Sequence, residues 1–380
     1  MAEGDIDTVI DSLQFDALDC TYPTFLHVSG NIFAVAYTGV DGDGFLITVE
    51  IDSSGNIGAA VIDSFEFDDV KGSYPFIFHV SGIVYGIAYR GVDSDGWLVT
   101  LTISAAGDIG AAVIDSWEFD GGECENPFVL HVSGDVYAIA YRNGSNHGDL
   151  VTVTISGAGV IGGALEDSFE FEVTACSHPS MIHISGNFFA IAYTGPNNNI
   201  KVVTLTISGA GVIGAAVTDT LEFDVAFCSE PVIINISGDV FAIAYTGAGN
   251  DGTIATLSIS EAGDISAAVI DSFEFDEVTA VSCFIVHVSG SVYAVAYQGD
   301  GADGFIITIT ISDAGDIGAA VIDSFEFDEG FCRDPTMIYL SGSVYAIAYM
   351  GVDDDGWLKT VGVETVLAAV SQHLFLMGVG

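Results

Sequence analysis

Acidic side chains recur in short loops spaced 52 residues apart, where they could bind a metal ion. Carboxylate oxygens on a glycine-containing turn are the ligands that Ca²⁺ prefers. Neighbouring carboxylates without a nearby Lys or Arg also repel each other unless a cation bridges them. We therefore expect a Ca²⁺ site in these loops, the alternative being that Asp and Gly only form tight turns. The candidate metal ligands are Asp41, Asp43, Asp93, Asp95, Asp251, Asp303, Asp353 and Asp355.

An aromatic residue follows each of the four most acidic loops: Phe45, Trp97, Phe305 and Trp357. An aromatic ring beside carboxylates suits a sugar, which stacks on the ring and donates hydroxyl hydrogen bonds. These four residues are therefore candidate ligand-binding residues. The alternative is that they pack at the edge of the fold.

The same 52-residue spacing extends along the chain and defines its elements. Between residues 75 and 120, β-rich runs at 75–82, 83–91, 96–104 and 111–119 predict four antiparallel strands, here named A to D. Strands A and B are joined by Ser81-Gly82, a pair suited to a two-residue hairpin turn. The strand-D aspartate of each repeat is predicted to be structural; its copies are Asp11, Asp63, Asp115, Asp167, Asp219, Asp271 and Asp323.

Seven such repeats resemble the seven-bladed β-propeller superfamily over nearly the whole chain. The resemblance implies an all-β fold of four-stranded antiparallel blades, with residues 1–380 as a single domain. In such a ring the B–C and D–A loops share one face. The Trp-Asp signature of WD repeats, the Gly-Gly pair of kelch repeats and the sialidase box are lacking, so the resemblance implies no activity.

The ends of the chain predict how the ring closes. Residues 2–16 match strand D, whereas the last repeat has strands A to C and ends near Val363. We expect the N-terminal strand to dock on the last blade. Residues 364–380 are left over and contain a second strand-D-like segment, from Val366 to Met377, which we expect to be an extra strand or tail. Its pairing with another subunit would give a homo-oligomer or filament.

The charge of the chain limits its partners. The 53 acidic residues against 6 Lys and Arg give a formal charge of −47. Nucleic acid and anionic membrane surfaces are therefore excluded as partners, because both need clustered positive charge. No run is apolar and long enough for a spanning helix, and the N-terminus shows no signal peptide. Divalent cations, glycans and other proteins remain.

Catalysis has little support in the sequence. The three arginines are far apart in the chain, so we expect no sialidase-like arginine cluster. Near-uniform blades suit multivalent binding better than a single active site. Five of the six cysteines occupy one slot without C-x-x-C spacing, which predicts small buried thiols. A polar ring on strand A is formed by His27, His79, His131, His183 and His287 with Asn235 and Tyr339. We expect these groups to hydrogen-bond between blades, for instance to strand-B tyrosines; the alternative is a metal site in the channel or a proton relay.

The sequence therefore predicts a non-catalytic binding or surface-structural propeller. Its acidic loop face would bind Ca²⁺, and a glycan or a protein partner. An extracellular or cell-surface location and a role in adhesion go with this hypothesis. The alternative is a hydrolase or lyase with its active site at the top of the central channel.

Overall fold

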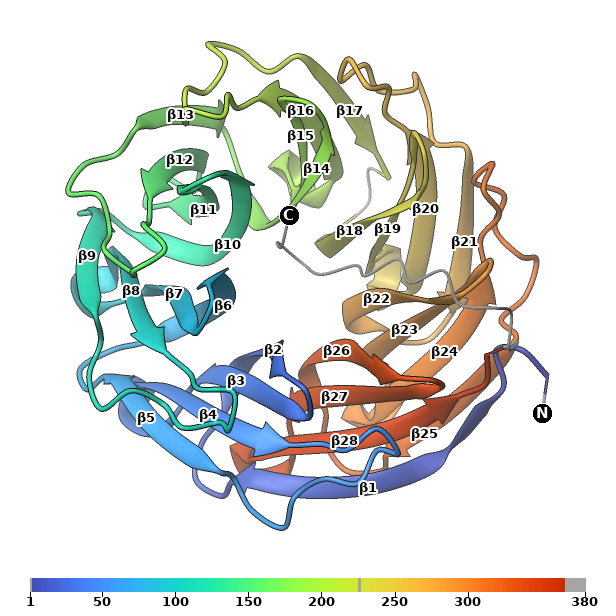
Figure 1. Cartoon of the computed structure of the whole chain (residues 1–380). Coiled ribbons are helices and arrows are strands. Elements are labelled where there is room, and N and C mark those ends of the chain that lie inside the picture. The colour runs from blue at the N-terminus through green and yellow to red at the C-terminus, as the bar shows by residue number, and fades with distance from the viewer. Residues whose placement is uncertain (1, 225–226, 366–380) are drawn as a thin grey trace.

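The computed structural model describes residues 2–224 and 227–365, which form seven four-stranded antiparallel sheets arranged in a ring (Figure 1). The predicted seven-bladed propeller is confirmed. Blade 1 contains β2 to β5, and blades 2 to 6 follow in the same order. Blade 7 contains β26, β27, β28 and the N-terminal strand β1.

Each blade uses its strands in the order A, B, C, D from the central axis outward. Strand A is β2 (Thr21–Ser29), β6 (Ser73–Ser81), β10 (Cys124–Ser133), β14 (Ser177–Ser185), β18 (Ser229–Ser237), β22 (Val281–Ser289) and β26 (Arg333–Ser341). Strand B is β3 (Ile32–Thr38), β7 (Val84–Arg90), β11 (Val136–Asn143), β15 (Phe188–Thr194), β19 (Val240–Thr246), β23 (Val292–Gln298) and β27 (Val344–Met350).

The outer strands and the short turns complete the blades. Strand C is β4 (Gly44–Glu50), β8 (Gly96–Thr102), β12 (Gly148–Thr154), β16 (Ile200–Thr206), β20 (Gly252–Ser258), β24 (Gly304–Thr310) and β28 (Gly356–Val363). Strand D is β5 (Asp63–Asp68), β9 (Asp115–Asp120), β13 (Asp167–Glu172), β17 (Asp219–Phe223), β21 (Asp271–Asp276), β25 (Asp323–Asp328) and β1 (Ile6–Asp16). Six B–C loops contain a 3-10 turn: η1 (Val40–Gly42), η2 (Val92–Ser94), η3 (Pro196–Asn198), η4 (Ala248–Asn250), η5 (Asp300–Ala302) and η6 (Val352–Asp354).

Strand D is shorter than predicted. The sequence predicts a strand over 111–119, but β9 begins at Asp115. The preceding Ile109 forms an isolated bridge with Ile103, and its N–H donates to the Asp63 carboxylate of blade 1 at 2.8 Å. Residues 111–114 bend before strand D begins, and the Ile114 N–H donates to the Thr100 carbonyl of strand C at 2.7 Å.

Strand β1 closes the ring as predicted. It pairs antiparallel with β28, with Ile6 opposite Val363 and Asp16 opposite Gly356. Figure 1 shows β1 lying along the outer edge of blade 7. The second strand-D-like segment, Val366 to Met377, lies outside the described residues.

Two hydrogen bonds are repeated at all seven blade interfaces. The strand-D aspartate of one blade accepts from the N–H of an isoleucine in the next blade, which confirms its structural role; the seven acceptors are Asp11, Asp63, Asp115, Asp167, Asp219, Asp271 and Asp323. A buried strand-C threonine donates to a glycine carbonyl of the next blade, as Thr48 does to Gly107 at 2.6 Å. The 52-residue repeat therefore encodes the contacts between blades as well as the blades themselves.

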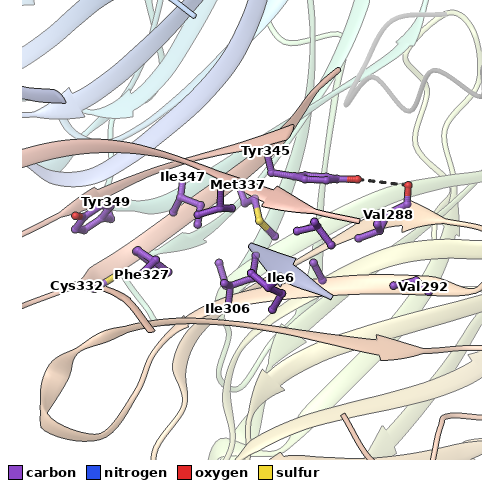
Figure 2. Packing of buried hydrophobic residues seen from close by; sticks show 14 residues of the cluster. Ile6, Val288, Val292, Ile306, Phe327, Cys332, Met337, Tyr345, Ile347 and Tyr349 are labelled. Atoms are coloured by element: carbon purple, nitrogen blue, oxygen red, sulfur yellow. Dashed lines mark hydrogen bonds between the residues drawn. The ribbon is translucent and has the colours of Figure 1, made fainter. Parts of the chain in front are cut away.

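Strand B is buried on both faces because every sheet packs between two others. In β3, Ala34 and Ala36 pack against Ile87 and Tyr89 of the next blade, so small side chains on one sheet leave room for large ones on its neighbour. Figure 2 shows the same packing between blades 6 and 7, where the Tyr345 hydroxyl also donates to the Val288 carbonyl at 3.4 Å.

Candidate functional site

The acidic B–C loops are tight turns that require left-handed backbone. The N–H of Asp43 donates to the Val40 carbonyl at 3.2 Å, and the two central residues, Asp41 and Gly42, have φ angles of 60° and 85°. Two successive positive φ values define a type I′ turn, which Asp, Asn and Gly favour. Among the eight predicted metal ligands, Asp41, Asp93 and Asp353 are exposed central residues of such turns.

The other predicted metal ligands, Asp43, Asp95, Asp251, Asp303 and Asp355, end their turns and are half-buried. Asp43 faces Glu66 of strand D: reduced hydration, a hydrogen bond to Asp43 and the charge of Asp43 raise the pKa of the Glu66 carboxyl. Reduced hydration and the charge of Asp303 likewise raise the pKa of Glu326. Sequence reasoning missed these strand-D partners, although the Glu of "SFEFD" recurs in six of the seven repeats.

Three blades carry a His, Asn or Gln side chain in place of one carboxylate of this pair. The His147 ring contacts Glu170 at 2.5 Å, the Asn199 amide donates to Glu222 at 2.5 Å, and Gln14 of β1 donates to Asp355. In the remaining blades both positions are carboxylates; these carboxylate pairs are Asp43 with Glu66, Asp95 with Glu118, Asp251 with Glu274 and Asp303 with Glu326. In blades 1, 5 and 6 the neighbouring carboxylates therefore favour binding of a proton or a cation. Blade 2 has the same two residue types at these positions in the sequence.

The carboxylate pairs are a sparse ligand set for calcium. Within residues 2–224 and 227–365, no group of three or more His, Cys, Asp or Glu side chains is placed to hold a metal ion. Ca²⁺ takes six to eight oxygen ligands, and one pair supplies at most four. Turn carbonyls and water would have to complete the shell.

The four predicted ligand-binding aromatics are half-buried and cover the glycine that begins each B–C loop. Phe45 stacks on Tyr37 with ring centroids 5.7 Å apart, and a Cβ on Gly39 would lie 2.4 Å from Phe45. Phe305, Trp97 and Trp357 cover Gly299, Gly91 and Gly351 in the same way. This contact explains the glycines and matches the packing alternative.

Trp97 also borders a shallow hollow between blades 1 and 2. The hollow has a volume of about 370 Å³ and is lined by Glu66, Asp68, Asp69 and Tyr89 together with Trp97. The indole Nε1 of Trp97 is buried without a hydrogen-bond partner. Trp97 is therefore a candidate contact for a ligand in this hollow.

The B–C and D–A loops lie on one face, here called the upper face, as predicted. The N–H of Cys20 in a D–A loop donates to the Asp354 carbonyl of the preceding B–C loop at 2.6 Å, and Cys176 donates to Asn146 at 2.7 Å. All six cysteines are buried, which agrees with the prediction of small buried thiols.

The predicted hydrogen bonds between strand-A histidines and strand-B tyrosines are wrong. The Nε2 atom of His27 contacts the carbonyl of Gly30 in its own A–B hairpin at 2.9 Å, and the other four histidines do the same. The Tyr37 hydroxyl instead donates to Asp16 of blade 7 at 2.7 Å. The turn glycine follows the histidine by only three residues, so the imidazole reaches its carbonyl within the same hairpin.

Sequence reasoning missed a ring of seven polar residues at the upper end of strand A, here called the inner ring. Its members occupy one position of the repeat, before the residue that is Pro in six blades: Tyr22, Tyr74, Asn126, His178, Glu230, Ser282 and Asp334. All seven have a positive φ, between 49° and 55°, at an irregularity in the A–B pairing. Non-glycine residues in this region cost free energy and are frequent at binding sites.

Members of the inner ring from successive blades contact one another. The rings of Tyr22 and Tyr74 lie 4.1 Å apart, and His178 Nε2 lies 3.9 Å from Glu230. The Ser282 N–H donates to Glu230 at 2.9 Å, and the Ser282 hydroxyl donates to Asp334 at 3.0 Å. The sequence signal was available, because this position holds six residue types in seven otherwise similar repeats.

Two of the three arginines lie together beside the inner ring, so the expected wide separation holds only for the third, Arg333 of blade 7. Arg90 contacts Glu125 at 2.8 Å and Arg142 contacts the other oxygen of the same carboxylate. Arg333 lies 3.9 Å from Asp334 in blade 7. Residues 52 apart in the sequence occupy equivalent places in adjacent blades, so sequence distance does not measure their separation.

Several buried polar atoms at the inner ring lack a partner. Among the described residues, six buried side-chain atoms have no hydrogen bond, and two of them, His178 Nδ1 and Asp334 Oδ2, belong to the ring. Arg90 Nε, at the end of strand B of blade 2, is another. Burial and the charge of Glu230 raise the pKa of Asp334 to about 6. Burial lowers the pKa of His178, and the charge of Glu230 opposes this shift.

Comparison of the sequence with family models finds no match, and comparison with curated proteins finds none. Solved structures do resemble the fold. Two proteins, from Bacteroides fragilis and Bacteroides uniformis, are each named a "putative 6-phosphogluconolactonase". They align with TM-scores of 0.58 and 0.60 at 12% and 11% identity, over 90% and 88% of this chain and 96% of each of theirs. BBS1N, solved in complex with ARL6DN, aligns with a TM-score of 0.58 at 8% identity, over 96% of this chain and 99% of its own.

The chain has a β-propeller fold. At these identities the likeness shows the fold alone, and the activity must be argued from the site. Among the described residues, no helix has the length and apolar character needed to cross a membrane.

Proposed function

We propose that this protein is a non-catalytic binding module whose upper face holds divalent cations, with Ca²⁺ as the main candidate, at the carboxylate pairs of blades 1, 2, 5 and 6. The observation that carries the proposal is the contrast with blades 3, 4 and 7, where a His, Asn or Gln donor takes the place of one carboxylate. In four blades a bridging cation would offset the repulsion between the two carboxylates. In the other three blades the His, Asn or Gln side chain removes that repulsion.

Such sites would be weak and repeated. Two carboxylates with turn carbonyls and water correspond to dissociation constants of about 10⁻⁴ to 10⁻³ M, the range of extracellular calcium modules. The sites would therefore be occupied only where calcium is abundant, which supports an extracellular or cell-surface location. Equivalent sites on one face also suit a multivalent adhesive partner.

Terbium luminescence tests the proposal, because Tb³⁺ replaces Ca²⁺ and is excited by nearby aromatic rings. A variant with Asn at Asp43, Asp95, Asp251 and Asp303 removes one carboxylate from every pair. We expect it to lose Ca²⁺-displaceable luminescence. The matched control has Asn at the turn-centre residues Asp41, Asp93 and Asp353 and should keep it.

A second variant tests for gain of a site. His147→Asp creates a carboxylate pair with Glu170 in blade 3, and we expect it to add one Tb³⁺ site. Equal binding by wild type, the four-site variant and His147→Asp would refute the proposed cation sites.

A glycan is the partner for which the hollow beside Trp97 gives support, because an indole face borders three carboxylates there. A protein partner is the other candidate, and a further copy of this chain could supply it through the C-terminal strand predicted from the sequence. Screening a glycan panel with wild type and Trp97→Ala tests the first, with Trp357→Ala as the matched aromatic control. Binding that depends on neither tryptophan would remove the hollow from consideration.

The competing function is a hydrolase or lyase working at the inner ring. Two fold neighbours bear a lactonase name, and the ring brings His178, Glu230, Ser282 and Asp334 together. Against catalysis, Ser282 donates its hydroxyl to Asp334 rather than to His178. Hydrolysis of 6-phosphogluconolactone by wild type, abolished in a Ser282→Ala or Asp334→Asn variant, would favour the enzyme.

A further inference from the structure

We propose that the inner ring is a single binding site for a primary ammonium group, which would lie between the carboxylates of Glu230 and Asp334 and beside the rings of Tyr22 and Tyr74. This site is separate from the carboxylate pairs of the proposed function. It lies on strand A near the central axis, whereas the pairs lie farther out, between the ends of the B–C loops and strand D.

The inner ring differs from blade to blade more than the positions on either side of it in the repeat. The Cys slot and the Pro position on either side of it keep one residue type in five and six of the seven repeats. A surface that repeats in every blade offers several equivalent sites. The inner ring instead presents two carboxylates, a hydroxyl, an amide, an imidazole and two phenols, each group at one place, so it offers a single arrangement of polar groups to a ligand. The ring can therefore select one ligand in one orientation.

Unpaired polar atoms show that the inner ring is unsatisfied as it stands. A buried polar atom without a partner costs free energy, so most such atoms in proteins are paired. Asp334 Oδ2 and His178 Nδ1 are buried without a hydrogen-bond partner, and the nearest cation to Asp334 Oδ2 is the Arg333 guanidinium, whose Nε lies 3.9 Å away. The Asp334 and His178 side chains keep 20% and 38% of their surface exposed, so a bound donor can approach them from the upper face.

The geometry of the acidic part of the ring fits an ammonium group. Ser282 bridges Glu230 and Asp334 through its N–H and its hydroxyl, so the three acceptors lie together. An ammonium group has three donors and can bond to two carboxylates and a hydroxyl at once. Arg333 lies 3.9 Å from Asp334 and offsets one of the two negative charges, leaving room for one more cation.

Two further features favour a cation over a neutral ligand. Tyr22 and Tyr74, in the two blades that follow Asp334 around the ring, present aromatic rings in contact with each other, and a cation is attracted to such faces. The formal charge of −47 also draws cations toward the protein from solution.

Calorimetric titration in 150 mM NaCl tests the site on the wild-type protein, where the salt screens non-specific attraction to the acidic surface. The cationic probe is Nα-acetyl-lysine amide, and its neutral control is the same compound acetylated at Nε. Butylamine is the second cationic probe. Binding of both amines would indicate a free amine as the ligand, and binding of the lysine compound alone would indicate a protein side chain; either supports the ammonium site. Equal heats from the acetylated control would overturn it.

Matched variants locate the binding. Glu230→Gln with Asp334→Asn should weaken the lysine probe about tenfold or more. The control pair, Glu261→Gln with Asp313→Asn, removes two exposed charges from the C–D turns on the opposite face and should leave binding unchanged. An equal loss of affinity in both double variants would overturn the proposal, because the probe would then be attracted only by the overall negative charge of the protein. Ser282→Ala, which keeps every charge, is the second variant if the first misfolds; unchanged binding in Ser282→Ala would also overturn it.

Discussion

The Asp323 carboxylate accepts a hydrogen bond from the N–H of Ile6 at 2.8 Å, across 317 residues of sequence. The same bond joins every other pair of neighbouring blades, but there it links segments 46 residues apart, as between Asp115 and Ile161. Between blades 6 and 7 it ties the N-terminal strand to the ring. Closure therefore uses the ordinary blade interface, with β1 supplied from the other end of the chain.

We predict that Asp323→Ala loosens β1 more than an equivalent change elsewhere loosens its blade. The Ile6 N–H would be left buried without a partner, at a cost of about 1–3 kcal/mol in the free energy of unfolding. Amide hydrogen exchange over residues 6–16 should become faster. Asp115→Ala removes the same bond to Ile161 and is the control; it should cost similar free energy and leave exchange in β1 unchanged.

Deletion of residues 2–16 is the stronger test of closure. It removes the outer strand of blade 7 and leaves the apolar residues of β28 without their partner strand. We expect loss of cooperative unfolding in urea. A stable, closed ring after the deletion would show that another segment, such as the one after Thr365, closes blade 7.

The repeat spacing predicted the blade and its interfaces because each was copied with the sequence. The seven strand-D aspartates could be assigned a structural role from their recurrence alone, and each accepts a bond from the next blade. Closure followed from the missing fourth strand of the last repeat. These predictions depend on one unit of 52 residues, which the sequence shows seven times.

The inner ring could not be predicted in this way. Glu230 and Ser282 are 52 residues apart, and their contact depends on a positive φ at both positions, which no residue type there signals. For the same reason the sequence did not predict that Arg90 and Arg142 bind one carboxylate, that of Glu125. Recurrence in the sequence identifies the residues that the blades have in common. The inner-ring position holds different residue types in different blades, so recurrence does not identify it.

We predict that salt stabilises the protein. With 53 acidic and 6 basic residues, repulsion between like charges opposes the compact state, and salt screens that repulsion. The melting temperature should rise as NaCl increases from 10 mM to 500 mM. KCl should act like NaCl, and an equal osmolality of sucrose separates screening from a solute effect. A melting temperature independent of NaCl would show that the acidic residues are already neutralised in pairs.

The glycine after each acidic loop is predicted to be required for packing. A Cβ on Gly304 would lie 2.6 Å from the Phe327 ring and 3.0 Å from Cys332. We expect Gly304→Ala to reduce the free energy of unfolding by about 1–3 kcal/mol, because the buried ring must move. Gly163→Ala is the control, since nothing lies within 4 Å of the added carbon. Equal stability of the two variants in urea would contradict this account.

The pH dependence of stability should report on Asp334. Burial and the charge of Glu230 raise its pKa to about 6 in the folded protein, well above the ordinary value for an aspartate. The folded state therefore binds this proton more tightly than the unfolded state. The ionised carboxylate costs stability at neutral pH, and that cost is relieved as the pH falls from about 6 toward 4. A shift of this size corresponds to at most about 3 kcal/mol, and the exposed part of the side chain reduces it.

Asp334→Asn should remove this contribution, since the amide does not titrate. We expect the variant to be more stable than wild type at pH 7 and to converge with it near pH 4, as measured by urea unfolding at pH 4.5, 5.5, 6.5 and 7.5. Asp313→Asn, on an exposed turn, should keep the wild-type slope. The Arg333 guanidinium and the Ser282 hydroxyl oppose the rise in the Asp334 pKa, so Ser282→Ala should steepen the slope. If wild type and Asp334→Asn keep a constant difference over this range, Asp334 is already ionised at pH 4.5 and the inner ring is more hydrated than its unpaired atoms indicate.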